Sequence, residues 1–293
     1  MSDPQSVLQR ARQRLAAQPA MSEAGEAYSA ECLAGHAAAV AATRARLDLA
    51  YGPHPDQRLD VFLPPQGSGP WPTVVFWHGG GWTNGGKEWC SFMAPALAAA
   101  GVALVAPSYR LLPDVPYPEP MRDAAAAVRW LRDHGGEVGL SPEGWILAGH
   151  SAGGQIAALL AVEPRWLREA GVPLERIAGC YAVSATFNRR NLNPAVGEAH
   201  LQPGAPEAVQ PDSPLALAEQ AFTDYLLVWG TAEHARVDVT GRAMAERLAA
   251  AERPVATAIE PGGTHFSMHL DHGDPDSSLS RRFRTWRQEL WRR

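Results

Sequence analysis

The sequence lacks several features that mark whole classes of protein. Its three cysteines, Cys32, Cys90 and Cys180, are odd in number, lie far apart and form no C-x-x-C pair. They argue against a disulfide framework and a zinc site, and nothing else in the sequence implies a metal or an organic cofactor. No apolar run approaches the roughly 18 residues of a transmembrane helix, and the N-terminal region lacks the apolar stretch of a secretory signal. We therefore expect a cytoplasmic protein without a membrane span.

Positive charge is also scarce. Lys and Arg total 26 against 31 for Asp and Glu, which gives a net charge of −5, and no long basic run occurs. This balance argues against nucleic acid as a partner. The residues that are present, 46% hydrophobic and 19% charged over 293 positions, are ordinary for a soluble enzyme. Chains of this length often fold as one α/β domain, so we expect a single domain over 1–293.

Apolar runs separated by Gly and Pro predict strands that alternate with helices. We expect strands at 47–50, 58–63, 73–77, 102–106, 145–148, 177–184, 225–229 and 255–259, and helices at 94–100, 121–133, 155–161, 237–250 and 278–291. This alternation indicates the α/β class, with a mostly parallel, eight-stranded sheet and helices on both faces.

Two segments fall outside this alternation. Residues 1–46 predict N-terminal helices, which we interpret as a partial cap over the site, with a surface helix or a dimer contact as the alternatives. Residues 185–217 have no clear periodicity and many Asn, Pro and Gly residues. We expect them to form an irregular insertion near the site.

The pentapeptide from Gly149 to Gly153 holds Ser151 between two glycines. An apolar run precedes it and a helix-forming run follows, which is the strand–turn–helix context of a nucleophile elbow. The glycines permit the close backbone approach that a strained turn needs. A Gly-rich turn with a solvated serine is the alternative, and only further catalytic residues elsewhere in the sequence can distinguish it from a nucleophile elbow.

A serine nucleophile needs a base, and the base needs an orienting acid, in the chain order Ser, Asp/Glu, His for an elbow-type fold. Glu233 follows the strand expected to end at Trp229, and His265 follows the one expected to end at Ile259. We predict Ser151 as nucleophile, His265 as base and Glu233 as acid. The rival bases are His234, His269 and His272, and the rival acid is Asp238.

The run Gly79-Gly80-Gly81 supplies candidates for an oxyanion hole. Glycine lets backbone N–H groups approach a substrate oxygen closely, so we predict the N–H groups of Gly80, Gly81 and Ala152 as donors. We interpret His78 as a structural histidine that hydrogen-bonds this loop. The predicted pocket residues are Trp82, whose bulk favours a small acyl group, and His150, Phe187 and Phe266.

Three motifs together resemble the α/β-hydrolase fold. They are residues 78–82, 149–154 and 262–266, which are similar to those of hormone-sensitive-lipase-like esterases. The resemblance is closer to the arylformamidase (kynurenine formamidase) branch, whose H-G-G-x-W motif residues 78–82 match. It implies a serine hydrolase that cleaves carboxylic esters, aryl amides or formamides of small acyl groups through an acyl-enzyme. Glu233 departs from the pattern, because an aspartate is usual there.

Several alternatives stay open within this interpretation. They are a general carboxylesterase, an arylformamidase acting on N-formylkynurenine-like substrates, an acyltransferase and a non-catalytic ligand-binding protein. Arg189 and Arg190 are candidates to meet a substrate carboxylate, with a solvated basic loop as the alternative. The expected partner is a small-molecule ester or amide, and a homodimer is left open.

Overall fold

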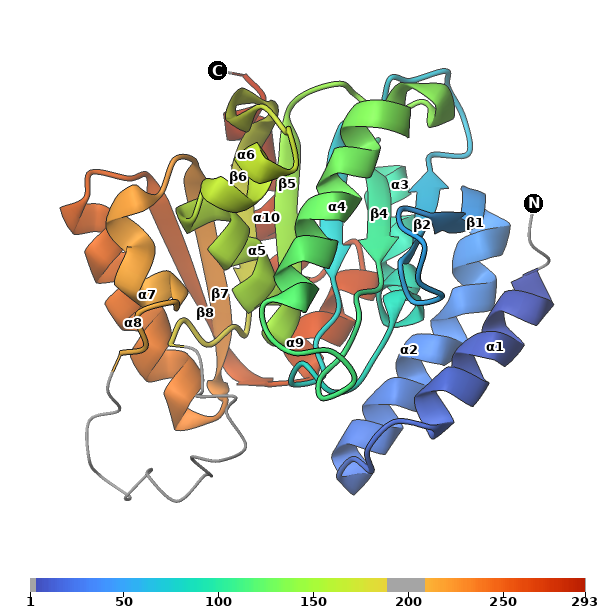
Figure 1. Ribbon diagram of the computed structural model, residues 1–293, viewed down its shortest axis with the longest axis horizontal. Helices are drawn as coiled ribbons and strands as arrows, with labels where there is room; N and C mark the ends of the chain where they lie inside the picture. Colours follow the sequence, from blue (N-terminus) through green and yellow to red (C-terminus); the bar gives the residue numbers. More distant parts are fainter. Residues whose placement is uncertain (1–3, 189–208, 293) are drawn as a thin grey trace.

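The computed structural model describes residues 4–188 and 209–292, and its sheet has eight strands. The spatial order of the strands is β1-β2-β4-β3-β5-β6-β7-β8 (Figure 1). β2 pairs antiparallel with β1 and β4, and every other pair is parallel, which confirms the predicted mostly parallel sheet. The strands are β1 Arg44–Ala50, β2 Arg58–Leu63, β3 Thr73–Trp77, β4 Ala103–Pro107, β5 Trp145–His150, β6 Ile177–Val183, β7 Asp224–Ala232 and β8 Val255–Thr264.

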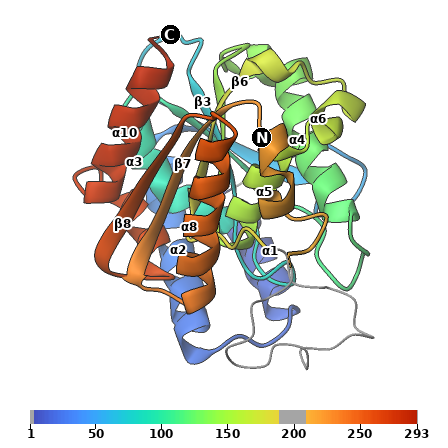
Figure 2. The same ribbon diagram turned by 90° about the vertical axis from the view of Figure 1, so that its left-hand side faces the viewer.

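Helices cover both faces of the sheet, because its central strands are apolar on both sides (Figure 2). In β3, Val75 and Trp77 pack toward α4, α5 and α8, whereas Val74 and Phe76 pack toward α3 and α10. The α-helices are α1 Pro4–Ala16, α2 Glu23–Ala42, α3 Ala94–Ala99, α4 Glu119–His134, α5 Ala152–Val162, α6 Arg165–Glu169, α7 Pro214–Leu217, α8 Ala235–Ala250, α9 Ser267–Leu270 and α10 Ser278–Leu290. Short 3-10 helices are η1 Lys87–Met93, η2 Gly135–Val138, η3 Leu174–Arg176, η5 Ala218–Gln220 and η6 Asp271–Gly273.

The predicted N-terminal helical region is helical only as far as Ala42. Thr43 is already extended, and its hydroxyl donates to the Ala39 carbonyl over 2.7 Å. Arg44 then begins β1 and pairs with Leu63 of β2. Pairing with a strand that is distant in sequence therefore overrides the local helical pattern.

A second difference occurs at β8, which continues to Thr264, beyond its predicted end at Ile259. Pro261 and the two following glycines give a turn signal in the sequence, yet the segment stays paired with β7. The ends of the two strands approach so closely that a Cβ on Gly230 would lie 1.9 Å from the Gly263 carbonyl oxygen. The residues that follow each strand are thereby brought together.

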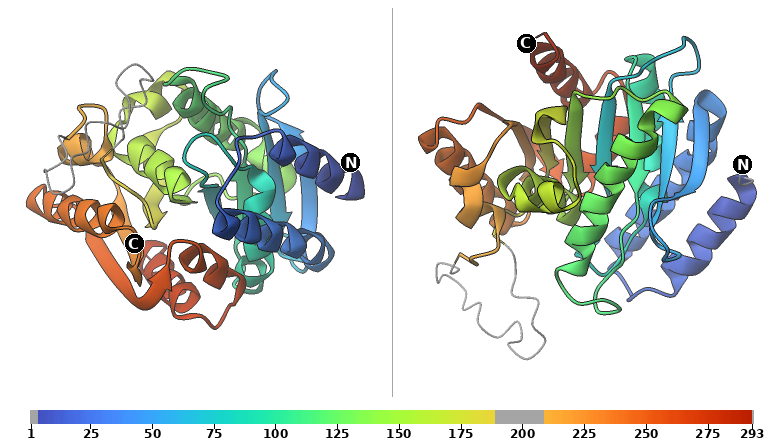
Figure 3. Two further views of the ribbon diagram at one scale, coloured as in Figure 1. Left: turned by 90° about the horizontal axis from the view of Figure 1, so that it is seen from below. Right: turned by 45° about the horizontal axis from the view of Figure 1, so that its top comes forward.

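The parallel strands all end at one edge of the sheet, which is where open α/β sheets place their sites. Seen toward this edge, α5 lies between the N-terminal helices and α8 (Figure 3, left). Within the described residues, no helix combines the length and the apolar character needed to cross a bilayer.

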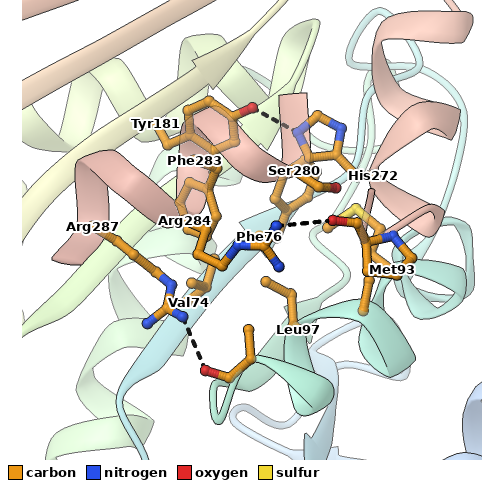
Figure 4. A pocket seen from close by; sticks show the side chains of 13 residues that line it. Val74, Phe76, Met93, Leu97, Tyr181, His272, Ser280, Phe283, Arg284 and Arg287 are labelled. Atoms are coloured by element: carbon orange, nitrogen blue, oxygen red, sulfur yellow. Dashed lines mark hydrogen bonds between the residues drawn. The ribbon is translucent and has the colours of Figure 1, made fainter. Parts of the chain in front are cut away.

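A small cavity lies on the α3–α10 face of the sheet (Figure 4). Its volume is about 30 Å³, which is room for about one water molecule. Tyr181 and His272 meet at its edge, with 2.6 Å between the hydroxyl and Nε2. The cavity is too small for an organic substrate, and none of the residues predicted for the triad, the oxyanion hole or the substrate pocket lines it.

Candidate active site

Ser151 stands at a sharp turn between β5 and α5. Its dihedrals, φ 54° and ψ −118°, are ones that non-glycine residues rarely adopt. A Cβ on Gly149 would lie 2.3 Å from the Gly153 carbonyl carbon, and one on Gly153 would lie 2.0 Å from the Trp77 carbonyl oxygen. Glycine is therefore required on both sides of the serine. This strained turn is the conformation that a nucleophile elbow needs.

A chain of hydrogen bonds joins Ser151, His265 and Glu233. His265 Nε2 lies 2.9 Å from Ser151 Oγ, and His265 Nδ1 lies 2.8 Å from Glu233 Oε2. An ionised carboxylate only accepts hydrogen bonds, so Nδ1 carries the proton and Nε2 accepts from the serine hydroxyl. The Glu233 side chain is 1% exposed, and Ser184 Oγ donates to its other oxygen. The arrangement can pass a proton from the serine to the imidazole.

The two loops that carry the predicted acid and base begin directly after neighbouring strands. Glu233 is the first residue after β7, and His265 is the first after β8. The His265 backbone is held in place, because His150 Nε2 donates to its carbonyl over 2.8 Å. Burial lowers the pKa of His150 well below its usual value, so this ring stays neutral.

Three of the four rival residues of the sequence analysis have other partners. His269 is buried against Tyr28, with 2.7 Å between its Nδ1 and the tyrosine hydroxyl, and His272 contacts Tyr181. Asp238 accepts a hydrogen bond from Trp229 and pairs with Arg242 near the surface. His234 lines the cavity described below, with its ring centroid 5.4 Å from that of His265.

The glycine loop after β3 is shaped to leave backbone N–H groups free. Gly80 and Gly81 have positive φ values of 108° and 63°, and within the described chain neither N–H donates to a backbone carbonyl. The N–H of Ala152, the first residue of α5, has no acceptor inside its helix. These three groups are the predicted oxyanion donors.

His78, at the start of the same loop, has the structural surroundings that the sequence analysis expected. Its Nδ1 donates to the Gly79 carbonyl over 2.7 Å, and its ring stacks on Tyr109 with 4.4 Å between centroids. Burial lowers the pKa of His78 to about 4, so the imidazole is neutral near pH 7.

A cavity of about 300 Å³ opens beside Ser151, and this size suits a small organic ligand. Trp82 forms one wall, and its Nε1 donates to Gln155 Oε1 over 3.1 Å. Gln155 in turn donates to the Thr186 carbonyl over 2.6 Å, which fixes the wall. The lining residues are Gly81, Trp82, Ser151, Ala152, Gln155, Thr186, His234, Arg236, Val237 and His265.

The other three predicted pocket residues do not line this cavity. His150 lies beneath the site and stacks on His269, with 4.9 Å between centroids. Phe187 is buried in the core, and Phe266 stacks on Tyr28, 4.6 Å away. His150 and Phe266 are each next to a predicted triad residue in sequence, and neighbouring side chains point in different directions.

Sequence analysis missed four lining residues, Gln155, Thr186, Arg236 and Val237. Gln155 carried a signal, because it is a polar residue at the start of the apolar helix α5. Arg189, Arg190 and the part of the 185–217 segment at 189–208 lie outside the described residues. Within the described ranges, no cluster of His, Cys, Asp and Glu is arranged to hold a metal ion.

Comparison with known proteins identifies relatives among esterases. Over 246 residues, the chain is 26% identical to ICMEL1 of Arabidopsis thaliana, a probable isoprenylcysteine alpha-carbonyl methylesterase. That match covers 77% of this chain and 52% of the relative. The chain is also 40% identical over 107 residues to the carboxylesterase NlhH of Mycobacterium tuberculosis, covering 36% and 34% of the two chains. The chain thus spans about half of the first relative and about a third of the second.

Solved structures show the same fold. Esterase B from Lactobacillus rhamnosis superposes with a TM-score of 0.70 and 20% identity, over 100% of this chain and 97% of that one. Residues 74–269 match the family described as having the alpha/beta hydrolase fold, and this range includes the elbow, the glycine loop, Glu233 and His265. The sheet order, the serine turn and this match agree, and the chain therefore belongs to the alpha/beta hydrolase fold family.

Proposed function

We propose that the protein is a serine carboxylesterase that cleaves esters of small acyl groups through an acyl-enzyme. The observation that carries the proposal is the hydrogen-bond chain from Ser151 through His265 to buried Glu233, at 2.9 and 2.8 Å, beside a ligand-sized cavity. The esterase names of the relatives support the same reaction class. The arylformamidase branch stays a prediction.

In the first half of the reaction, Ser151 Oγ attacks the ester carbonyl carbon while His265 Nε2 takes the hydroxyl proton. The carbonyl oxygen becomes an oxyanion that the N–H groups of Gly80, Gly81 and Ala152 stabilise. Collapse of the intermediate breaks the bond to the alcohol oxygen, and the proton on His265 passes to the leaving alcohol. Glu233 stays ionised throughout and stabilises the imidazolium.

In the second half, water replaces the alcohol. The water oxygen attacks the acyl carbon while His265 Nε2 takes a proton from the water. The bond from the acyl carbon to Ser151 Oγ then breaks, and His265 returns this proton to Ser151 Oγ. The products are a carboxylic acid and the free enzyme. If an added alcohol took the place of water, the product would be a new ester, and product analysis with an added acceptor separates acyl transfer from hydrolysis.

The cavity wall supports a preference for short acyl groups. Trp82 is 5% exposed and is held by Gln155, so the indole cannot swing aside without breaking a buried hydrogen bond. We expect kcat/KM for p-nitrophenyl esters to be highest for acetate or butyrate and to fall for octanoate and palmitate. Equal rates across the series would refute the size preference while leaving the serine mechanism intact.

An arylformamidase acting on N-formylkynurenine-like substrates is the second candidate, and one observation favours it. Arg236 lines the cavity that holds Ser151, and a guanidinium pairs well with the carboxylate of an amino-acid-derived formamide. The test compares N-formylkynurenine with p-nitrophenyl acetate in the wild type and in Arg236→Gln. A fall in kcat/KM for the formamide alone would support this candidate, and no turnover of the formamide by the wild type would exclude it.

A further inference from the structure

The linker between α1 and α2 grips the loop that follows the oxyanion glycines. The side-chain amide of Gln18 makes two hydrogen bonds to the backbone of Gly85: Oε1 accepts from the N–H over 2.7 Å, and Nε2 donates to the carbonyl over 2.9 Å. At the next position of the linker, the Pro19 carbonyl accepts from Asn84 Nδ2 over 2.7 Å. Residues 84 and 85 are therefore held from outside their own loop.

These hydrogen bonds to residues 84 and 85 affect the oxyanion loop through one turn of backbone. The Gly80 carbonyl accepts from the N–H groups of Thr83 and Asn84, over 3.1 and 2.9 Å. In a trans peptide, the C=O of one residue and the N–H of the next point in opposite directions. The donors that fix the Gly80 carbonyl therefore also fix the direction of the Gly81 N–H, one of the proposed oxyanion donors.

Close packing makes the coupling stiff. A Cβ on Gly80 would lie 2.1 Å from the Asn84 carbonyl oxygen, and one on Gly85 would lie 2.5 Å from His78 Nδ1. The backbone of 84–85 thus packs directly against Gly80 and the His78 ring, so Gly85 has little space in which to shift.

The helix that precedes the linker is fixed to the rest of the protein by an ion pair with a buried carboxylate. Arg14, in the last turn of α1, forms an ion pair of 2.5 Å with Glu88, whose side chain is 1% exposed. Glu88 also pairs with buried Lys87 over 2.9 Å, and these cations lower the pKa of Glu88 to about 2, so it stays charged. α1 and α2 lie side by side next to the β1 edge of the sheet (Figure 1), and none of their described residues lines the cavity beside Ser151.

We propose that Gln18 is a positioning residue, which sets the direction of the Gly81 N–H by holding Gly85 from behind. The N-terminal helices would then act on the reaction by supporting the oxyanion loop. This inference rests on the proposed serine esterase function. Because the oxyanion forms after substrate has bound, a misdirected donor lowers kcat and leaves KM nearly unchanged.

The test is a set of variants in the full chain, assayed on p-nitrophenyl acetate. Gln18→Ala should lower kcat about 10- to 100-fold, which does not exceed the loss expected when a whole oxyanion donor is removed. KM should stay within about twofold of the wild-type value. Gln18→Glu should lose as much, because it places a carboxylate oxygen against the Gly85 carbonyl. Gln18→Met keeps the side-chain volume. If the alanine variant has an altered melting temperature, kcat of Gln18→Met is the measurement that tests the proposal.

The matched control is Gln9→Ala, since Gln9 is exposed on α1 and should keep full activity. A second readout is a trifluoromethyl ketone, whose Ser151 adduct places an oxyanion in the hole. Its affinity should fall by the same factor as kcat/KM.

Three results would overturn the proposal: an unchanged kcat in Gln18→Met, an equal loss in Gln9→Ala, or a rise in KM at constant kcat. Failure of the proposed function itself would look different, because wild-type protein would then be inactive.

Discussion

The charge on Glu233 gives the sharpest prediction. In the proposed mechanism His265 takes the serine proton and becomes an imidazolium, with its Nδ1 2.8 Å from a carboxylate oxygen of Glu233 that is shielded from water. With charge centres about 4 Å apart and an effective dielectric of about 20, their attraction is roughly 4 kcal/mol. Glu233→Gln removes this attraction, and its amide can also donate to Nδ1 and select the wrong tautomer. We therefore expect kcat to fall at least about a thousandfold.

The assay is steady-state hydrolysis of p-nitrophenyl acetate, with KM expected to change by less than about threefold because Glu233 does not line the cavity beside Ser151. The variant should fold, since the glutamine oxygen can still accept from Ser184 Oγ. Glu137→Gln is the matched control, because it makes the same chemical change on a side chain that is 73% exposed. If Glu233→Gln kept more than about a tenth of wild-type kcat, the carboxylate would not be stabilising the imidazolium, and the acid assignment would be wrong.

Three further predictions concern the glycine loop, the buried His272 and the pocket. Gly80→Ala should abolish esterase activity, because its Cβ would lie 2.1 Å from the Asn84 carbonyl oxygen; Gly81→Ala, whose Cβ meets nothing within 4 Å, should fold with about 1–2 kcal/mol less stability. Urea unfolding of both variants measures the loss of stability, and a Gly81→Ala variant as stable as the wild type would contradict the prediction. Burial lowers the pKa of His272 to about 4, so the unfolded chain binds its proton first and stability falls as the pH drops from about 6.5 to 4. His272→Asn should remove up to about 1.4 kcal/mol per pH unit from that slope, and an unchanged slope in denaturation curves would refute the assignment. Trp82→Ala should raise kcat/KM for octanoate relative to acetate about tenfold, and no change in this ratio would show that the indole does not limit acyl length.

Local signals were sufficient for most of the sheet and for the serine turn. The apolar run of β3 and the two glycines around Ser151 predict their local conformation directly. Burial on both faces requires the apolar run, and close backbone approach requires the glycines. The chain order of an elbow-type fold then selected the acid and base positions that the structure brings within hydrogen-bond reach.

Features that depend on distant pairing could not be predicted in the same way. The turn residues near Gly263 indicated a loop, and only pairing with β7 keeps β8 extended to Thr264. His150 and Phe266 do not line the cavity beside Ser151, because being next to a predicted triad residue in sequence does not place a side chain on the same face. The contact of Gln18 with Gly85 spans 67 positions and leaves no local pattern.

The most direct test of the whole account is covalent labelling with a fluorophosphonate, followed by intact-protein and peptide mass spectrometry. The account predicts one adduct per chain, on Ser151, with esterase activity lost in proportion to labelling and no adduct in Ser151→Ala. An active protein labelled at another residue, or an active protein that is not labelled at all, would contradict it.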